Sequence, residues 1–193
     1  MKKTILLYLF MVLFLGGCIP LEGRAPWTIM GGIYTMSSQN FEVELPEGWR
    51  RHNFTPDALL ITLDGLSLQQ ICIARSPIDK EIPYTQKKFS KGMLPQEVAE
   101  VVIDHMRFNP NIMNLKITEN IPARISNYSG FKLIYSYQTN GGLKKKSIYY
   151  GFMMENWYYG LLYDAPARHY FEKDLPTFER VKESFRILKD AAS

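Results

Sequence analysis

The chain has 193 residues, of which 46% are hydrophobic and 22% are charged, and its formal net charge is +4. This length favours a single domain, and the ordinary globular composition excludes a disordered chain, a collagen-like repeat and a coiled coil. The two cysteines are too few for a disulfide scaffold or for most multi-cysteine zinc modules. Composition alone indicates no biochemical activity, so the elements and motifs are taken in chain order.

The first residues have the order of a secretory signal. Lys2-Lys3 precedes an apolar run, Ile5–Leu15, which is shorter than the about 20 residues of a membrane-spanning helix but fits the apolar region of a signal peptide. The run ends in Leu15-Gly16-Gly17-Cys18, which resembles the lipobox of bacterial lipoproteins. The resemblance implies cleavage before Cys18 and covalent lipid on that cysteine. An ordinary signal peptide that is cut nearby and leaves a free cysteine is the alternative.

These features predict three segments: a cleaved signal peptide over 1–17, a lipidated tether over 18–32 and a single domain over 33–190. Without Lys2 and Lys3 the net charge falls to +2, which is too small to indicate nucleic-acid binding. We therefore predict a protein of the cell envelope that is attached to the membrane through its lipid. Ile19 follows the cysteine where an aspartate would signal retention, so in an organism with two membranes the predicted location is the periplasmic face of the outer membrane or the cell surface.

The first half of the domain begins with short strands. Phe41–Leu45 alternates apolar and polar residues, which is typical of a half-buried strand. Ala58–Leu63 and Leu68–Ala74 flank the turn dipeptide Asp64-Gly65, so they are predicted to form a hairpin or meander. The polar stretch 76–92 is interpreted as a long connection.

A helix is predicted over Pro95–Phe108, with proline in its first turn and an apolar face that includes Val98 and Val102. Four strands follow, over Leu115–Ala123, Gly130–Tyr137, Lys145–Met154 and Trp157–Tyr163. The last three are apolar on both faces, which is typical of strands in the middle of a sheet that is covered on both sides. Ala165-Pro166 is predicted to end the last strand.

The final helix is predicted over Tyr170–Arg186. Its apolar stripe has steps of four and three residues, which indicates a face directed to the core. Pro176 either kinks this helix or marks a restart that Asp174 could cap. The stripe consists of Phe171, Leu175, Phe178, Val181 and Phe185.

The order of these pieces resembles the PsbP-like superfamily over about residues 40–188. The segments that carry the resemblance are Phe41-Glu-Val-Glu-Leu-Pro-Glu-Gly-Trp49, Gly130-Phe-Lys-Leu-Ile-Tyr135, Asp164-Ala-Pro166, Pro176-Thr-Phe178 and Glu183-Ser-Phe185. The resemblance implies an α+β fold, an α/β/α sandwich around a central, mostly antiparallel sheet. That superfamily includes an extrinsic subunit of photosystem II, a Ran-binding nuclear-transport factor and bacterial secreted or lipid-anchored proteins. It transfers no catalytic residue to this chain, and fold alone does not transfer function.

Candidate catalytic and metal-binding residues are few. Glu100 and Asp104 have the spacing of helix-borne metal ligands, but His105 falls on the apolar face, so we predict no metal site and a histidine at the edge of the core. Asp164 and His169 flank a loop after the last strand. We predict that they form a hydrogen bond at the start of the final helix, with acid–base chemistry as the alternative. The sequence contains no nucleophile elbow and no phosphate-binding loop. We therefore predict neither catalytic nor cofactor-binding residues.

Two further features have alternative interpretations. Cys72 lies between Ile71 and Ile73 in a predicted strand and is expected to be a buried structural thiol, with a redox or intermolecular role as the alternative. Lys144, Lys145 and Lys146 follow the Asn140-Gly141-Gly142 turn. They could contact anionic lipid or an acidic partner, or form a solvated edge that resists aggregation. In either case all three are expected at the surface, where their replacement by glutamine leaves stability unchanged.

Three functions remain open. The first is a lipid-anchored, non-enzymatic binding or assembly module with an envelope protein as partner and no bound cofactor. The second is a carrier or sensor of a small apolar ligand held between sheet and helix. The third and weakest is an envelope hydrolase. The sequence indicates neither the oligomeric state nor the identity of a partner.

Overall fold

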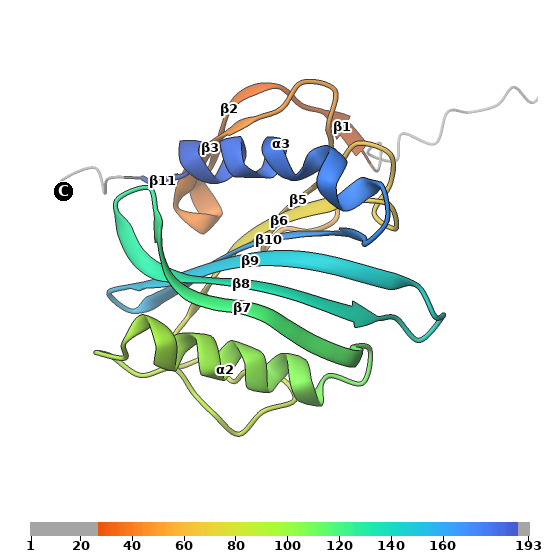
Figure 1. The fold of residues 1–193 in the computed structure, drawn as a ribbon. Helices are drawn as coiled ribbons and strands as arrows, with labels where there is room; N and C mark the ends of the chain where they lie inside the picture. The colour runs from red at the N-terminus through yellow and green to blue at the C-terminus, as the bar shows by residue number, and fades with distance from the viewer. Residues whose placement is uncertain (1–26, 189–193) are drawn as a thin grey trace, which may run out of the picture.

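The computed structural model describes residues 27–188; the lipobox with Cys18 lies outside this range. Two helices lie on opposite sides of a large twisted sheet, and a second, smaller sheet packs beside one of the helices (Figure 1). The elements are β1 (Trp27–Ile29), β2 (Gly32–Met36), the 3-10 helix η1 (Ser37–Gln39), β3 (Phe41–Leu45), β4 (Arg50–His52), β5 (Leu59–Thr62), β6 (Gln70–Pro77), α2 (Pro95–Phe108), β7 (Met113–Ile125), β8 (Tyr128–Gln138), β9 (Lys144–Met154), β10 (Trp157–Pro166), α3 (Tyr170–Ser184) and β11 (Arg186–Ile187).

The large sheet has the strand order β1-β4-β5-β6-β10-β9-β8-β7, and each of its pairings is antiparallel. Strands β8, β9 and β10 lie inside this order, as their apolar faces predict. In β9, Ile148, Tyr150 and Phe152 belong to the core on one face, whereas Tyr149 and Met153 pack on the other. Successive side chains of a strand point to opposite faces, so each of these strands serves two separate cores.

The first core lies between the large sheet and α3 together with the small sheet, whose order is β11-β3-β2. The predicted apolar stripe of α3 is confirmed: Phe171, Phe178 and Val181 are buried, and Phe185 is buried directly after the helix end. Pro176 lies inside one continuous helix. Asp174 therefore caps no restarted helix; it is buried, and its carboxylate accepts a hydrogen bond of 3.1 Å from Gln69 Nε2.

The second core lies on the opposite face, beneath α2. This helix has the predicted bounds and packs on β7, β8 and β9, at one end of the strand order. The segment 78–94 runs beside the helix and adds Ile78 and Phe89 to the same core (Figure 1). Helix and segment together cover only part of this face of the sheet.

Several boundaries differ from those predicted by a few residues; the final helix, for example, ends at Ser184, and Arg186 lies in β11. Two differences change an assignment. Trp27–Ile29 pairs with Arg50–His52, so a strand of the large sheet lies inside the range 18–32 that was assigned to the tether. Strand β10 also continues through Ala165 to Pro166, which pairs with Lys145. The strand ends at this proline, as expected, but it includes Ala165 and Pro166, because the loss of one N–H is tolerated at a strand end.

Candidate functional site

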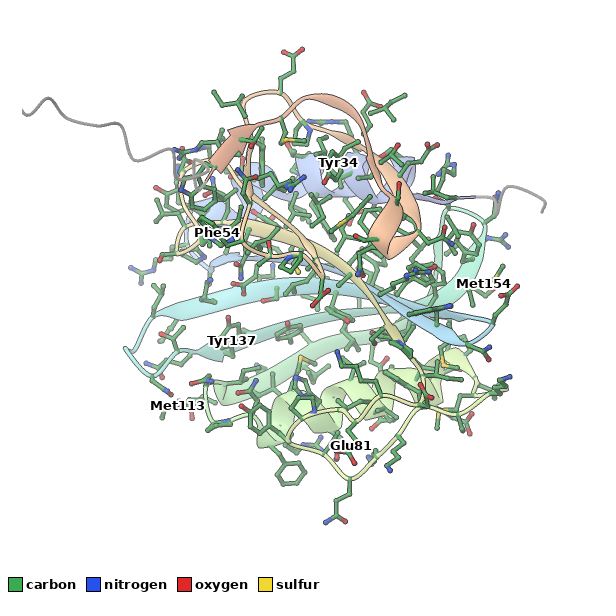
Figure 2. The ribbon with its side chains drawn as sticks, turned by 180° about the vertical axis from the view of Figure 1, so that it is seen from behind. Tyr34, Phe54, Glu81, Met113, Tyr137 and Met154 are labelled. Atoms are coloured by element: carbon green, nitrogen blue, oxygen red, sulfur yellow. The ribbon has the colours of Figure 1, made fainter. Side chains whose placement is uncertain are left out.

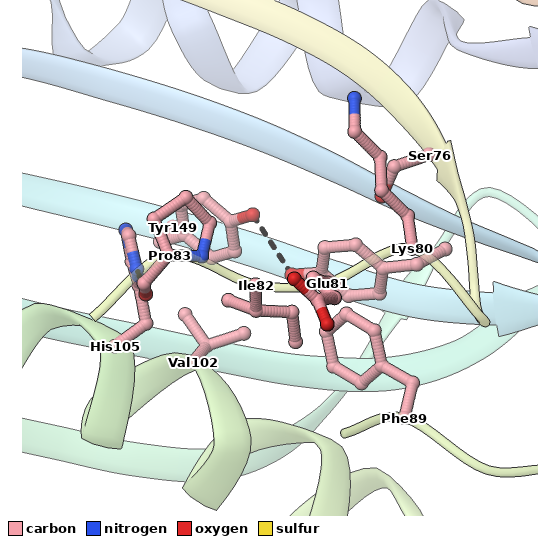
Figure 3. A pocket seen from close by; sticks show the side chains of 10 residues that line it. Ser76, Lys80, Glu81, Ile82, Pro83, Phe89, Val102, His105 and Tyr149 are labelled. Carbon is pink, nitrogen blue, oxygen red and sulfur yellow. Dashed lines mark hydrogen bonds between the residues drawn. The ribbon is translucent and has the colours of Figure 1, made fainter. Parts of the chain in front are cut away.

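A pocket of about 330 Å³ lies between the large sheet, α2 and the segment 78–94 (Figure 3). The sheet contributes Tyr149, Tyr158 and Ser76, and α2 contributes Val102 and His105. The remaining lining residues come from the segment: Lys80, Glu81, Ile82, Pro83 and Phe89. An apolar cavity with a few converging polar groups is the usual form of a small-molecule site.

Two tyrosines on neighbouring strands supply the polar groups of the pocket floor. The Tyr158 hydroxyl donates a hydrogen bond of 2.8 Å to the Tyr149 hydroxyl, as Figure 3 shows by a dashed line. The pair forms because β10 has a glycine where the Tyr149 side chain crosses it: a Cβ on Gly160 would lie 2.2 Å from the Tyr149 hydroxyl oxygen. Gly160 therefore determines the position of Tyr149.

Both tyrosines remain protonated at neutral pH. Burial raises the pKa of Tyr149 to about 12, although the hydrogen bond from Tyr158 partly opposes this shift. Burial, together with the neighbouring Tyr149, raises the pKa of Tyr158 well above its ordinary value. The two hydroxyls therefore offer a ligand neutral hydrogen-bonding groups and no negative charge.

Contacts with α2 and the sheet position the segment that forms the outer wall of the pocket. His105 Nδ1 lies 2.6 Å from the carbonyl oxygen of Pro83, and the His105 ring stacks on Tyr84 with 5.8 Å between centroids. A carbonyl only accepts, so Nδ1 carries the proton of this hydrogen bond. On the sheet side, Phe89 stacks on Tyr158 at 4.4 Å.

Asp104, the residue directly before His105, holds the same segment. Its carboxylate accepts a hydrogen bond from Thr85 and forms an ion pair of 3.3 Å with Lys87. The Thr85 hydrogen bond, followed by Lys87, lowers the pKa of Asp104. Glu100 lies on the exposed side of α2. Within residues 27–188, no group of three or more His, Cys, Asp or Glu side chains is placed to hold a metal ion.

The other two histidines lie apart from the pocket lining. The His52 ring packs between Trp27 and Phe54 near the sheet edge. His169 precedes α3 with φ of 66° and makes no side-chain capping hydrogen bond. His169 therefore does not form the hydrogen bond at the helix start that was predicted for Asp164 and His169.

The structure separates the three consecutive lysines. Lys144 is exposed, and Lys146 forms an ion pair of 3.0 Å with Glu172. Lys145 is only 6% exposed, and its ammonium group pairs with the carboxylate of Asp164. The expectation that all three lie at the surface is therefore wrong for Lys145. The edge-strand interpretation fails as well, because β9 lies between β10 and β8.

Asp164 is the centre of a buried polar cluster on the α2 side of the sheet. Ser147 Oγ donates a hydrogen bond of 2.6 Å to its carboxylate, and Tyr137 donates one of 3.1 Å. Gln70 Nε2 completes the shell at 3.3 Å. Burial, followed by the nearby Asp164 carboxylate, raises the pKa of Tyr137 far above its ordinary value. With Lys145 and these donors in place, the carboxylate is fully engaged within the protein.

Cys72 lies on the same face in β6, between Leu60 of β5 and Leu162 of β10 in the register. It is half-buried, and burial raises the pKa of its thiol to about 11. A thiol that is protonated at neutral pH is a poor nucleophile. These contacts favour the structural role that the sequence predicts.

Sequence reasoning missed the pocket because 76–92 has the composition of an ordinary connection. Gly160 and Gly151, each inside a strand of bulky residues, gave a signal, since a glycine in a strand often marks a close approach. The structure also contains no helix among the described residues that is long and apolar enough to cross a membrane.

Comparison with known proteins finds no matching family and no curated protein of similar sequence. Solved structures do resemble it. Cyanobacterial PsbP (CyanoP) from Synechocystis sp. PCC 6803 has a TM-score of 0.54 at 13% identity, over 90% of this chain and 98% of that one. The Saccharomyces cerevisiae Ran-binding protein Mog1p has a TM-score of 0.55 at 5% identity, over 84% of this chain and 97% of that one.

A Bacteroides thetaiotaomicron protein has a TM-score of 0.50 at 13% identity over 87% of this chain. This chain spans only 50% of the length of that protein. Identities this low show the fold alone. The chain thus has an α+β fold of the PsbP and Mog1 type, and the fold class predicted from its sequence is confirmed.

Proposed function

We propose that the mature chain is a lipid-anchored, non-enzymatic module of the cell envelope that binds a small, largely apolar ligand. The pocket between α2, the segment 78–94 and the sheet is the observation that supports ligand binding. It favours the carrier or sensor among the functions that the sequence left open. The lipobox at Leu15–Cys18 supports the anchor and the envelope location.

The polar groups of the pocket are suited to binding a ligand rather than to catalysis. Tyr149 and Tyr158 are neutral hydroxyls that already bond to each other. His105 directs Nδ1 to a backbone carbonyl. A general base must lie within hydrogen-bond reach of the proton that it removes and must have a pKa near the operating pH. The pKa values of the two phenols lie far above that pH. The expected ligand has an apolar body, fitting against Val102 and Phe89, and one polar group that reaches the hydroxyls.

The pocket can be tested with N-phenyl-1-naphthylamine, an apolar fluorophore with one N–H group. We expect saturable fluorescence enhancement with one site per chain. Val102→Phe should abolish it, because the larger side chain fills the pocket. Val98→Phe is the control, since Val98 is also buried on α2 but does not line this pocket. Equal binding by both variants, at unchanged melting temperatures, would contradict the proposal.

The anchor has a separate test. The mature protein should begin at Cys18, with an N-terminal peptide heavier by a diacylglyceryl group and one further acyl chain. Two or more chains anchor a protein stably, because each buried CH₂ contributes about 0.8 kcal/mol. Cys18→Ser, or treatment of cells with globomycin, should remove this mass and leave the protein uncut or outside the membrane fraction. An unmodified Cys18 on the mature wild type would end this part of the proposal.

A further inference from the structure

Apolar side chains gather at the sheet edge where the described chain begins. Ile29 is 76% exposed and Phe54 is 61% exposed. The His52 ring joins Phe54 to Trp27, with centroid distances of 5.0 Å to Trp27 and 5.8 Å to Phe54. Ile29 lies on the same strand as Trp27, two residues further along. We call Trp27, Ile29, His52 and Phe54 the β1 patch. Figure 2 shows Phe54 at this side of the molecule, next to β1.

Strand register places the β1 patch on the α2 side of the large sheet. Thr28 pairs with Arg51, and Arg51 pairs with Ile61, which belongs to the core under α3. Paired residues share a face and neighbouring residues alternate, so Trp27 and Ile29 point to the opposite side.

Helix α2 packs on β7, β8 and β9, at the far end of the strand order from β1. It therefore leaves this end of the face in contact with solvent.

Arg50 adds a positive charge to the apolar surface. It pairs with Ile29, so it shares the face of the patch, and its guanidinium lies 5.9 Å from the centre of the Trp27 ring. Tryptophan with aliphatic side chains and arginine is the combination that proteins use at the boundary between headgroups and acyl chains. An isolated exposed hydrophobic residue needs no such explanation, but a contiguous group marks an interaction surface.

We infer that the β1 patch docks the domain onto the surface of the lipid bilayer to which the chain is tethered. This inference rests on the proposed lipid anchor. Eight residues lie between Cys18 and Trp27, and the nine residue steps from one to the other span at most about 32 Å even when fully extended. The tether joins the domain at β1 itself, so the β1 patch is the apolar surface held nearest to the lipid. Insertion of Ile29 and Phe54 orients the domain with β1 toward the membrane and with α2, on the opposite side of the molecule, away from it (Figure 1).

The test uses the lipidated protein in vesicles of phosphatidylethanolamine and phosphatidylglycerol, with part of the lipid brominated near the acyl-chain start. Brominated lipid should quench part of the tryptophan emission, and Trp27→Phe should remove that quenched part. Trp49 is buried, and Trp157 is covered by Arg75 at 4.0 Å, so neither should report on the bilayer.

Two matched double variants separate the β1 patch from exposed apolar residues in general. Ile29→Asp with Phe54→Asp should lower the quenched fraction to that of Trp27→Phe. Leu94→Asp with Phe108→Asp should leave it unchanged, because these residues are also 63% exposed but lie on α2 or its cap. Both double variants change only exposed side chains, and their melting temperatures verify that they fold.

Several results would overturn the inference. Equal quenching in both double variants, or quenching that survives Trp27→Phe, contradicts insertion of the β1 patch even where mass spectrometry shows lipid on Cys18. If the wild type is a dimer in detergent and only the Ile29→Asp/Phe54→Asp variant is a monomer, the β1 patch binds a second copy of the chain and not the bilayer. If Cys18 carries no lipid, only the proposed anchor is wrong. Vesicle binding by the unlipidated chain then tests the β1 patch: binding that Ile29→Asp with Phe54→Asp removes supports docking by the patch, and binding that is absent or unchanged contradicts it.

Discussion

The two faces of the large sheet are built from the same strands but have different chemistry. On the α3 side, β9 and β10 present Phe152 and Tyr159, whose rings stack at 5.0 Å with 6° between their planes, and Phe185 closes over both. On the α2 side the same strands present the Lys145–Asp164 pair and the hydroxyls of Tyr149 and Tyr158. One face is a closed aromatic core. The other combines an apolar core under α2 with polar groups, a pocket and an uncovered end.

Because of this difference, neighbouring residues of one strand contribute to different properties, one to stability and the next to binding. Because side chains alternate along a strand, Tyr150 and Tyr149 are neighbours in sequence but lie in different cores. Substitutions of Ile148, Tyr150 or Phe152 in β9 should therefore alter folding and leave the pocket intact. Substitutions at odd-numbered positions should alter the polar cluster or the pocket.

The largest expected effect is on the aromatic face. Phe185→Ala should lower the free energy of unfolding by about 3–5 kcal/mol, because it removes a buried ring and leaves a cavity. The Phe185 ring contacts Phe41 at 5.4 Å as well as the rings of the sheet. Leu94→Ala, at an exposed position, is the control and should change stability by no more than about 0.5 kcal/mol. Urea titration measures both, and a loss below about 1 kcal/mol for Phe185→Ala would show that the stripe is not part of the core.

The buried ion pair gives the second largest effect. Lys145→Met should lower stability by about 3 kcal/mol, because it leaves the Asp164 carboxylate buried without a cation. Lys144→Met, one residue away and exposed, should have almost no effect. A double variant with Asp164→Asn should lose less than the sum of the two single changes, since the neutral amide needs no cation. Additive losses would show that the two side chains do not interact.

The sequence predicted the elements well where the signal is local. The alternation in β3 and the apolar stripe of α3 depend on spacing within one element, and both are confirmed. The bounds of α2 follow from Pro95 and from Asn109-Pro110, which are also local signals.

The site was not predictable in this way, because it depends on contacts between distant residues. Lys145 lies between two other lysines, and nothing in this local sequence distinguishes it from an exposed lysine. Only the register of β9 with β10 brings it to Asp164, 19 residues later. The pocket likewise depends on how the segment 78–94 packs on α2 and on the space above Gly160. No periodicity within either segment encodes these contacts.

A smaller loss of stability is expected from a substitution in the floor of the pocket, on the α2 side of the sheet. Gly160→Ala places a methyl group against the Tyr149 hydroxyl, so the tyrosine must shift; overpacking of this kind costs about 1–3 kcal/mol. We expect the variant to lose N-phenyl-1-naphthylamine binding by distorting the pocket floor. Gly141→Ala is the control, because the nearest atom to its added Cβ is 3.9 Å away. Adding Tyr149→Phe to Gly160→Ala should restore part of the stability, and failure to do so would show that another contact causes the strain.

The smallest effect is expected from the two lysines of the run that lie outside the buried cluster. Lys144→Gln with Lys146→Gln removes an exposed charge and a partly exposed ion pair with Glu172. Ion pairs of this kind contribute about 0–1 kcal/mol. Lys146 Nζ also lies 4.3 Å from the centre of the Phe171 ring, and that contact at a partly exposed site contributes about 0.5–1 kcal/mol. Stability should therefore fall by less than about 2 kcal/mol.

The same variant tests whether these lysines act as a surface contact. Binding of the lipidated chain to vesicles should be unchanged, because we assign membrane docking to the β1 patch and not to the lysines. Electrostatic attraction between exposed charges weakens with salt, over a Debye length of about 8 Å at 0.15 M. If the double variant lost a part of the binding that 0.5 M salt also removes from the wild type, Lys144 and Lys146 would be a second, electrostatic contact. The end of β9 beside α3 would then engage anionic lipid or an acidic partner through charge, while the β1 patch engages the bilayer through apolar contact.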